Sequence, residues 1–288
     1  VEPAARPYSI ARAGEQGTLS FQITPPAAAS TGELRVESAQ GMTTIAYDHI
    51  PPQTLFPTAS VRLVRADVQS LAKRIGYVMG AGDDVPQALR QWGAEVTLLS
   101  EDDLTRADLS RYDAIIAGVR AYNTRADLRA NHDRLLAYVS NGGAYLVQYN
   151  VATGGPFGRA SNELDRIGPF PLTVGRERVT VEEAPLTPVK PDSPLLSAPN
   201  RITPADYEGW VQERGLYFSS KWDERYQPLW EAGDPGEKPS QGATLWTRHG
   251  KGVYVFTPMS WFRQLPAGVP GAHRIFANLV SAGKLLAQ

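Results

Sequence analysis

The chain has 288 residues, of which 42% are hydrophobic and 20% charged. This balance is typical of a globular protein and excludes disordered and fibrous classes. Its 29 Lys and Arg residues against 30 Asp and Glu residues give a formal net charge of -1. No general positive field therefore attracts nucleic acid or an anionic membrane, and no apolar run approaches the length of a membrane span. We expect neither a nucleic-acid partner nor a membrane span.

The sequence contains no cysteine. This excludes disulfides, thiolate zinc sites, iron–sulfur ligation and cysteine nucleophiles. Its four histidines are scattered, without the H-x-x-x-H spacing that places two imidazoles on one helix face. We therefore expect no metal site and no cofactor. The first residues resemble neither a signal peptide nor a natural start, so we expect a fragment, either a processed protein or one domain of a longer protein.

Residues 1–65 have the pattern of a β-rich segment followed by a linker. Polar and apolar residues alternate over residues 18–24 and 32–37, which predicts two strands, and a third is expected at 42–47. The proline-rich stretch 50–57 cannot be regular helix, because proline removes amide donors and restricts the preceding residue. We expect it to be an ordered connector.

Residues 66–288 have the pattern of an α/β domain. Short apolar runs predict parallel strands at 74–79, 95–99, 113–119 and 144–149. Helical patterns are found at 85–92 and 125–140. Two further strands at 243–248 and 252–257 and a helix at 271–282 close the chain. Strands that alternate with helices are typical of a doubly wound, flavodoxin-like parallel sheet.

Residues 151–240 form an expected insertion, rich in Gly and Pro, with short strands near Leu172 and Val179. Residues 207–230 contain seven aromatic residues. Two of them, Trp210 and Trp222, are candidates for stacking on a sugar. The alternative is an internal packing cluster, which is favoured because large aromatic side chains contribute most when buried.

The loop after the first predicted α/β strand carries Asp83 and Asp84. It is no dinucleotide fingerprint, because two carboxylates would repel a pyrophosphate. Ligands of doubly wound sheets lie beyond the carboxyl ends of the strands, so either carboxylate is a candidate partner for a ligand hydroxyl. Alternatively, one of them caps the helix that starts near Val85 and the other is solvated.

The next loops add Arg120, Tyr122 and Asn123 after the third strand, and Asn150 after the fourth. We expect these side chains to meet the two carboxylates at one edge of the sheet, where they suit a neutral polyol such as a carbohydrate. The alternative is structural, with Arg120 paired to Asp83 or Asp84 and with Asn123 or Thr124 capping the next helix. The G-x-S-x-G elbow of a serine hydrolase is absent.

A resemblance to a known family is carried by four segments: IGYVMGAGDDVPQALRQWGAEVTLLS, YDAIIAGVRAYNT, NGGAYLVQYN and RHGKGVYVFTPMSWFRQLPAGVPGAHRIFANLVSAG. Together they resemble the class I glutamine amidotransferase-like domain at the C-terminus of bacterial PIG-L (LmbE-like) deacetylase-family proteins, which is similar to ThuA-like domains. The resemblance covers about residues 74–284. It implies that residues 1–50 are the tail of a β-sandwich-like region.

The resemblance also implies a function. Tyr149 or Asn150 stands where amidotransferases have their nucleophilic cysteine, so glutaminase chemistry is lost. The implied role is a non-catalytic accessory or carbohydrate-binding module. Its partner would be an upstream zinc-dependent deacetylase domain of the same polypeptide, in the periplasm or secreted. The alternatives are a structural or oligomerisation module, or a hydrolase with an unconventional site at the sheet's carboxyl edge.

Overall fold

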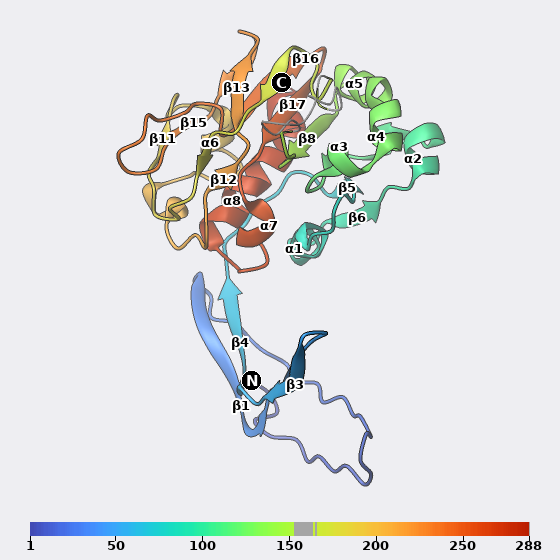
Figure 1. Cartoon of the computed structure of the whole chain (residues 1–288), viewed down its shortest axis with the longest axis vertical. Coiled ribbons are helices and arrows are strands. Elements are labelled where there is room, and N and C mark those ends of the chain that lie inside the picture. The colour runs from blue at the N-terminus through green and yellow to red at the C-terminus, as the bar shows by residue number, and fades with distance from the viewer. Residues whose placement is uncertain (153–163, 165, 288) are drawn as a thin grey trace. The chain divides into compact units, whose positions relative to one another are not determined.

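The computed structural model describes residues 1–152, 164 and 166–287 (Figure 1). The chain divides into two compact units, Val1–Asp67 and Val68–Gln288. Among the described residues, no helix combines the length and apolar character needed to cross a membrane.

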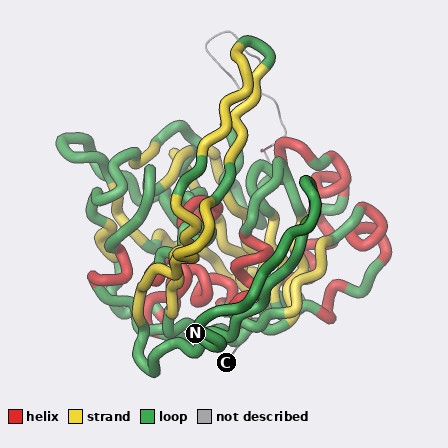
Figure 2. The backbone as a smooth tube through the Cα atoms, turned by 90° about the horizontal axis from the view of Figure 1, so that it is seen from below, coloured by secondary structure: helices red, strands yellow, loops and turns green. Residues whose placement is uncertain are grey.

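The first unit is built from two antiparallel strand pairs. β1 (Ser30–Gln40) pairs with β4 (Thr58–Arg65), and β2 (Thr43–Tyr47) pairs with β3 (Ile50–Leu55). The strand predicted at 18–24 is not formed, and Figure 2 shows most of the N-terminal stretch as loop.

The proline-rich stretch expected to be a connector is strand β3. Pro51 and Pro52 lie where the pairing with β2 changes register, between the pairs Tyr47–Ile50 and Ile45–Gln53. Proline is tolerated at such irregular positions because fewer amide donors are needed there. The prediction of a connector was therefore wrong.

The second unit is organised around a seven-stranded sheet of order β14-β16-β17-β8-β7-β5-β6. Its parallel strands are β5 (Arg74–Val78), β6 (Glu95–Leu98), β7 (Ala114–Ala117), β8 (Ala144–Gln148) and β17 (Gly252–Thr257). The remaining strands, β16 (Leu245–His249) and β14 (Gln227–Pro228), are antiparallel. The four predicted parallel strands are confirmed. The parallel part has the flavodoxin-like order 2-1-3-4-5, consistent with an amidotransferase-like α/β fold.

Helices cover both faces of this sheet (Figure 1). One face packs against α1 (Val85–Gln91), α8 (Pro270–Val280) and α9 (Ala282–Leu286). The other packs against α2 (Glu101–Arg106), α3 (Ala121–Thr124), α4 (Ala126–Ala130) and α5 (His132–Ser140). Every residue of β7 and β8 is buried. A strand covered on both faces is continuously apolar, which explains why these runs could be recognised in the sequence.

The long helix predicted at 125–140 is divided into α4 and α5, with α3 before them. Arg125 has an extended backbone, and the Asn131 side-chain amide donates to the Asp127 carbonyl over 2.9 Å. Polar side chains that bond to nearby backbone compete in this way with continuous helix. The predicted helix at 85–92 is confirmed as α1, and the last predicted helix comprises α8 and α9.

The described residues of the inserted region form three antiparallel strand pairs and short helical turns. The pairs are β9 (Leu172–Val174) with β13 (Ser219–Trp222), β10 (Arg178–Val179) with β12 (Gly215–Leu216), and β11 (Leu186–Pro188) with β15 (Trp230–Ala232). Its short helix is α6 (Pro194–Ser197), whereas α7 (Trp261–Gln264) lies outside the insertion and follows β17. The strands expected near Leu172 and Val179 are thereby confirmed.

Candidate functional site

The loops after β5, β7 and β8 meet at the carboxyl edge of the sheet. The Ala81 amide donates to the Val119 carbonyl over 2.8 Å, and the Arg120 amide donates to the Tyr149 carbonyl over 2.7 Å. Gly80 permits the first contact, because a Cβ at this residue would lie 2.1 Å from the Val119 oxygen. The side chains predicted for this edge can therefore be assessed one by one.

The Asp83 carboxylate is used within the protein. It accepts hydrogen bonds from the Tyr77 hydroxyl over 2.6 Å, from the Val85 amide over 3.1 Å and from the Val119 amide over 3.2 Å. Asp84 is exposed and makes no side-chain cap to α1. This matches the structural alternative, in which one carboxylate holds the helix start and the other is solvated.

Tyr122 is buried in the core. Its hydroxyl lies 2.8 Å from His132 Nδ1 and accepts a 2.9 Å hydrogen bond from the Tyr145 hydroxyl. Burial raises its pKa. A side chain so enclosed cannot contact a ligand at the edge, which corrects its prediction as a ligand-binding residue.

The side-chain amides of Asn150 and Asn123 hold the loop after β8 in place by hydrogen bonds. Asn150 is buried, accepts from the Tyr122 amide over 3.0 Å and donates to the Gln148 carbonyl over 2.9 Å. Asn123 exchanges two hydrogen bonds with the backbone of Val151, of 3.1 and 2.9 Å. Both residues lie at the predicted edge, but their polar atoms face the backbone.

The two tryptophans do not form one wall. Trp210 is 4% exposed and packs at a ring-centroid distance of 5.3 Å against Trp261, in the core on one face of the sheet. Trp222 is half-buried against the core on the other face. For Trp210 the packing interpretation of the aromatic segment therefore holds, and the predicted stacking wall is corrected.

Arg120, like Asp84, remains exposed at the predicted edge. Among the described residues, Arg120 forms no ion pair with either Asp83 or Asp84. Its backbone has φ 57°, in the left-handed region. The alternative of an arginine consumed by a loop carboxylate is not realised.

An aromatic group that sequence reasoning missed lies beside Arg120. The Tyr149 ring contacts Tyr217 and Phe262, each at a centroid distance of 5.5 Å, and all three are half-buried. Arg263 lies over the Phe262 ring at 5.0 Å and pairs with Glu213 over 3.0 Å. We name this set, together with Arg120, the Tyr149 cluster.

Strained backbone is concentrated around the Tyr149 cluster. In the described part of the chain, three residues other than glycine have positive φ: Arg120 (57°), Gln212 (66°) and Tyr217 (60°). Two belong to the cluster, and Gln212 precedes Glu213. Such a conformation costs roughly 1–2 kcal/mol and persists only where the surroundings impose it.

Gln264 imposes the conformation at Gln212. Its fully buried side chain accepts from the Val211 amide over 2.8 Å and donates to the carbonyls of Val211 over 2.8 Å and Glu213 over 3.2 Å. The family resemblance implied that Tyr149 or Asn150 stands at the position of the missing nucleophile. Tyr217 and Phe262, whose rings contact Tyr149, could not be singled out in the sequence, because nothing but their aromatic character marks them.

The Tyr149 hydroxyl is harder to ionise than a free tyrosine. Burial and the neighbouring Tyr217 and Glu213 raise the pKa of the Tyr149 hydroxyl, despite the opposing effect of two arginines. The residues that the structure describes contain no group of three or more acidic or histidine side chains that could hold a metal ion.

No protein-family model matches the sequence, and no curated protein matches it either. Among solved structures, the chain is similar to a putative ThuA-like protein from Bacteroides uniformis ATCC 8492, with 11% identity, TM-score 0.43, and coverage of 75% of this chain and 91% of that one. It is also similar to a cytoplasmic protein from Salmonella typhimurium, with 15% identity, TM-score 0.46, and coverage of 87% and 94%.

A third similar structure is the β-galactosidase from Rahnella sp. R3, with 16% identity and TM-score 0.44. The match covers 74% of this chain but 31% of the β-galactosidase, so the chain spans about a third of that protein. At these identities the likenesses concern the fold and carry no information on a ligand.

Proposed function

We propose that this chain is a non-catalytic accessory module that binds carbohydrate at the Tyr149 cluster. The observation that supports this most is the convergence of strained backbone and half-buried aromatic rings at the position of the missing nucleophile. Backbone strain of this kind is concentrated in ligand clamps and active sites.

The chemistry of the cluster supports a neutral polyol. The three rings offer apolar faces for the C–H groups of a sugar, and arginine and carboxylate groups supply donors and acceptors for its hydroxyls. Arg263 is already neutralised by Glu213. Arg120 and the exposed Asp84 carry opposite charges, so the edge has no strong preference for an ion.

The proposal excludes covalent catalysis at this site. A tyrosine hydroxyl is already protonated at neutral pH, and burial raises the pKa of Tyr149 further. A protonated phenol is a poor nucleophile unless a base lies beside it. Binding is therefore the function that the described side chains serve best.

We extend the proposal to the parent polypeptide. The resemblance of the four sequence segments to PIG-L-associated domains supports an upstream zinc-dependent deacetylase, outside the cytoplasm. The coding sequence upstream of Val1 provides the test. We expect it to encode an A-H-P-D-D-E-type zinc motif, and a different upstream domain would contradict this part of the proposal.

The binding proposal is tested by calorimetric titration of N-acetylglucosamine, trehalose and short oligosaccharides. Glycine is the substitution of choice at Arg120 and Tyr217, because it removes the side chain and suits the positive φ. We expect Arg120→Gly and Tyr217→Gly to stay folded and to weaken binding at least tenfold.

Gln212→Gly is the matched control. Gln212 has the same left-handed backbone, but its side chain is exposed. It should leave affinity unchanged. Absence of saturable binding by the folded wild-type chain, or binding unchanged by both test substitutions, would contradict the proposal and favour a structural module.

A further inference from the structure

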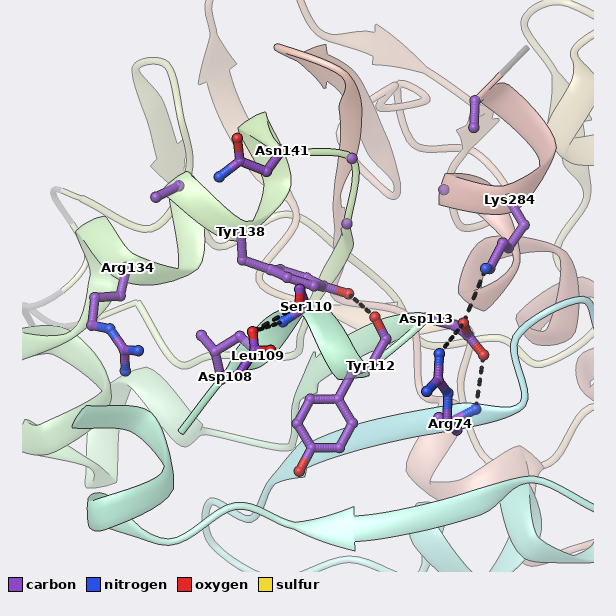
Figure 3. Close-up of a pocket in the computed structure, with 15 residues that line it drawn as sticks. Arg74, Asp108, Leu109, Ser110, Tyr112, Asp113, Arg134, Tyr138, Asn141 and Lys284 are labelled. Carbon is purple, nitrogen blue, oxygen red and sulfur yellow. Dashed lines mark hydrogen bonds and ion pairs between the residues drawn. The ribbon is translucent and has the colours of Figure 1, made fainter. Parts of the chain in front are cut away.

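A cavity of about 460 Å³ lies at the opposite, amino edge of the sheet, where β5, β7 and β8 begin (Figure 3). It is bounded by Arg74 of β5, by the segment before β7, by α5 and the turn after it, and by Lys284 of α9. The volume lies within the range of small-molecule sites. The Tyr149 cluster is not part of it, so the cavity is a separate candidate.

The buried carboxylate of Asp113 organises one side of this cavity. Its side chain is 8% exposed, and Oδ2 accepts from the amides of Lys73 over 2.8 Å and Arg74 over 2.9 Å. Oδ1 lies 3.1 Å from Lys284 Nζ and 3.7 Å from Arg74 Nη2. One carboxylate is thus shared by two cations, which leaves an excess positive charge.

These two cations can reach a ligand. The side chains of Arg74 and Lys284 are 56% and 52% exposed, and Figure 3 shows both directed at Asp113 from different elements. Their spacing is set by a buried group that is itself held by two backbone amides. The pair is therefore pre-organised, which lowers the entropic cost of binding an anion between them.

Hydrogen bonds also hold the polar side chains on the other side of the cavity in place. Asp108 accepts from the Ser110 amide over 2.9 Å and from its hydroxyl over 2.7 Å. Arg134 donates to the carbonyls of Leu104 and Ala107. Three cations and two carboxylates line the cavity, a net charge of +1.

The Tyr138 side chain lies between the two sides and is 7% exposed, so it closes the cavity from below without offering an open ring face. The Tyr138 ring lies against Gly143, where a Cβ would approach the ring to 2.2 Å, and its hydroxyl donates to the Tyr112 carbonyl over 3.1 Å. Asn141 lies at the end of α5 above this ring (Figure 3). The exposed Asn141 and Asp108 are therefore the polar groups that a ligand body can reach beside the two cations.

We propose that this cavity binds a small organic anion, bearing a carboxylate or a phosphate, with the anionic group held between Arg74 and Lys284 and its hydroxyl-bearing body directed at the exposed Asp108 and Asn141. Such a site is distinct from the carbohydrate site at the carboxyl edge. Cations held by a buried carboxylate favour an anion, and the acceptors of Asp108 and Asn141 favour hydroxyls beside it.

The test is a calorimetric titration of the whole chain with glucuronate, glucose 6-phosphate and glucose, each at low and at high salt. We expect at least one anion to bind, more weakly at high salt, and glucose to bind at least tenfold more weakly. The anion that binds more tightly identifies carboxylate or phosphate as the natural group. Equal affinity for glucose and both anions would overturn the proposal.

Single substitutions test where the anion binds. Lys284→Gln and Arg74→Gln should each weaken anion binding at least tenfold, whereas Lys221→Gln, an exposed lysine of β13, should not. Arg120→Gly should preserve anion binding, which separates this site from the carboxyl edge. Anion affinity unchanged by both Lys284→Gln and Arg74→Gln, or lost in Arg120→Gly, would place the site elsewhere.

Discussion

At the residue scale, two adjacent carboxylates have different roles. Asp83 accepts three hydrogen bonds, two of them from the backbone amides of Val85 in α1 and Val119 in the loop after β7, whereas Asp84 is exposed. Removing an acceptor from partly buried donors costs roughly 1–3 kcal/mol, while exposed substitutions usually stay within about 0.5 kcal/mol. We therefore expect Asp83→Ala to lower the free energy of unfolding by about 1–3 kcal/mol and Asp84→Ala to leave it nearly unchanged.

Urea unfolding of the two variants and the wild type measures this difference. Because the substitutions are chemically identical and one residue apart, they share any effect on net charge. Equal stability losses would show that the hydrogen bonds of Asp83 contribute little.

For the residues of the carboxyl edge, the sequence predicted their location better than their contacts. The ends of parallel strands lie at one edge, so Asn150 and Arg120 could be placed together. Whether an amide faces a ligand or a neighbouring loop depends on the loop path, which no local pattern encodes. The left-handed backbone at Arg120 was equally unpredictable, because arginine rarely adopts it.

At the scale of elements, the carboxyl edge depends on the close approach of the loops after β5 and β7. A Cβ on Gly80 would lie 2.1 Å from the Val119 oxygen and 2.6 Å from the Ala121 nitrogen. Backbone atoms cannot move away as a flexible side chain can. We expect Gly80→Ala to destabilise the protein by roughly 1–3 kcal/mol, as overpacking does.

Thermal unfolding measures this effect. Gly32→Ala in β1 is the matched control, since a Cβ there meets no atom within 4 Å. We expect it to leave the transition of the α/β unit unchanged. A Gly80→Ala variant that unfolds at the wild-type temperature would mean that the two loops separate without cost.

Elements were predicted best where burial alone determines them. The parallel strands are continuous apolar runs because both of their faces are covered. Helix α2 was missed, although Ser100 and Asp103 form a capping box whose S-x-x-D pattern is visible in the sequence. The break between α4 and α5 was not visible, because it depends on a side-chain hydrogen bond of Asn131.

At the scale of the whole molecule, the buried core belongs entirely to the α/β unit. Among the described side chains of residues 1–67, none is buried, and the first buried residue along the chain is Ala72. The titratable groups whose burial makes stability depend on pH therefore lie in the second unit. Two of these groups are histidines, His132 and His273.

Both histidines are enclosed in the neutral form. Burial, with a smaller effect of Arg166, lowers the pKa of His132 to about 4. Burial also lowers the pKa of His273, despite its hydrogen bond to the Leu265 carbonyl. His273 Nδ1 accepts from the Trp92 indole over 2.8 Å and Nε2 lies 2.9 Å from that carbonyl, an arrangement that needs one protonated and one bare ring nitrogen.

Stability should therefore fall as the pH is lowered from about 6.5 toward 4. An unfolded histidine has a pKa of about 6.5, so in this window the unfolded state binds more protons than the folded state, and stability rises with pH. For His132 alone the loss between these limits is about 3 kcal/mol. Urea unfolding at half-unit pH steps measures it, and His132→Asn should flatten the slope while His49→Gln, at an exposed residue, should not. A stability that stays constant down to pH 4.5 would show that both rings are protonated without cost in the folded protein.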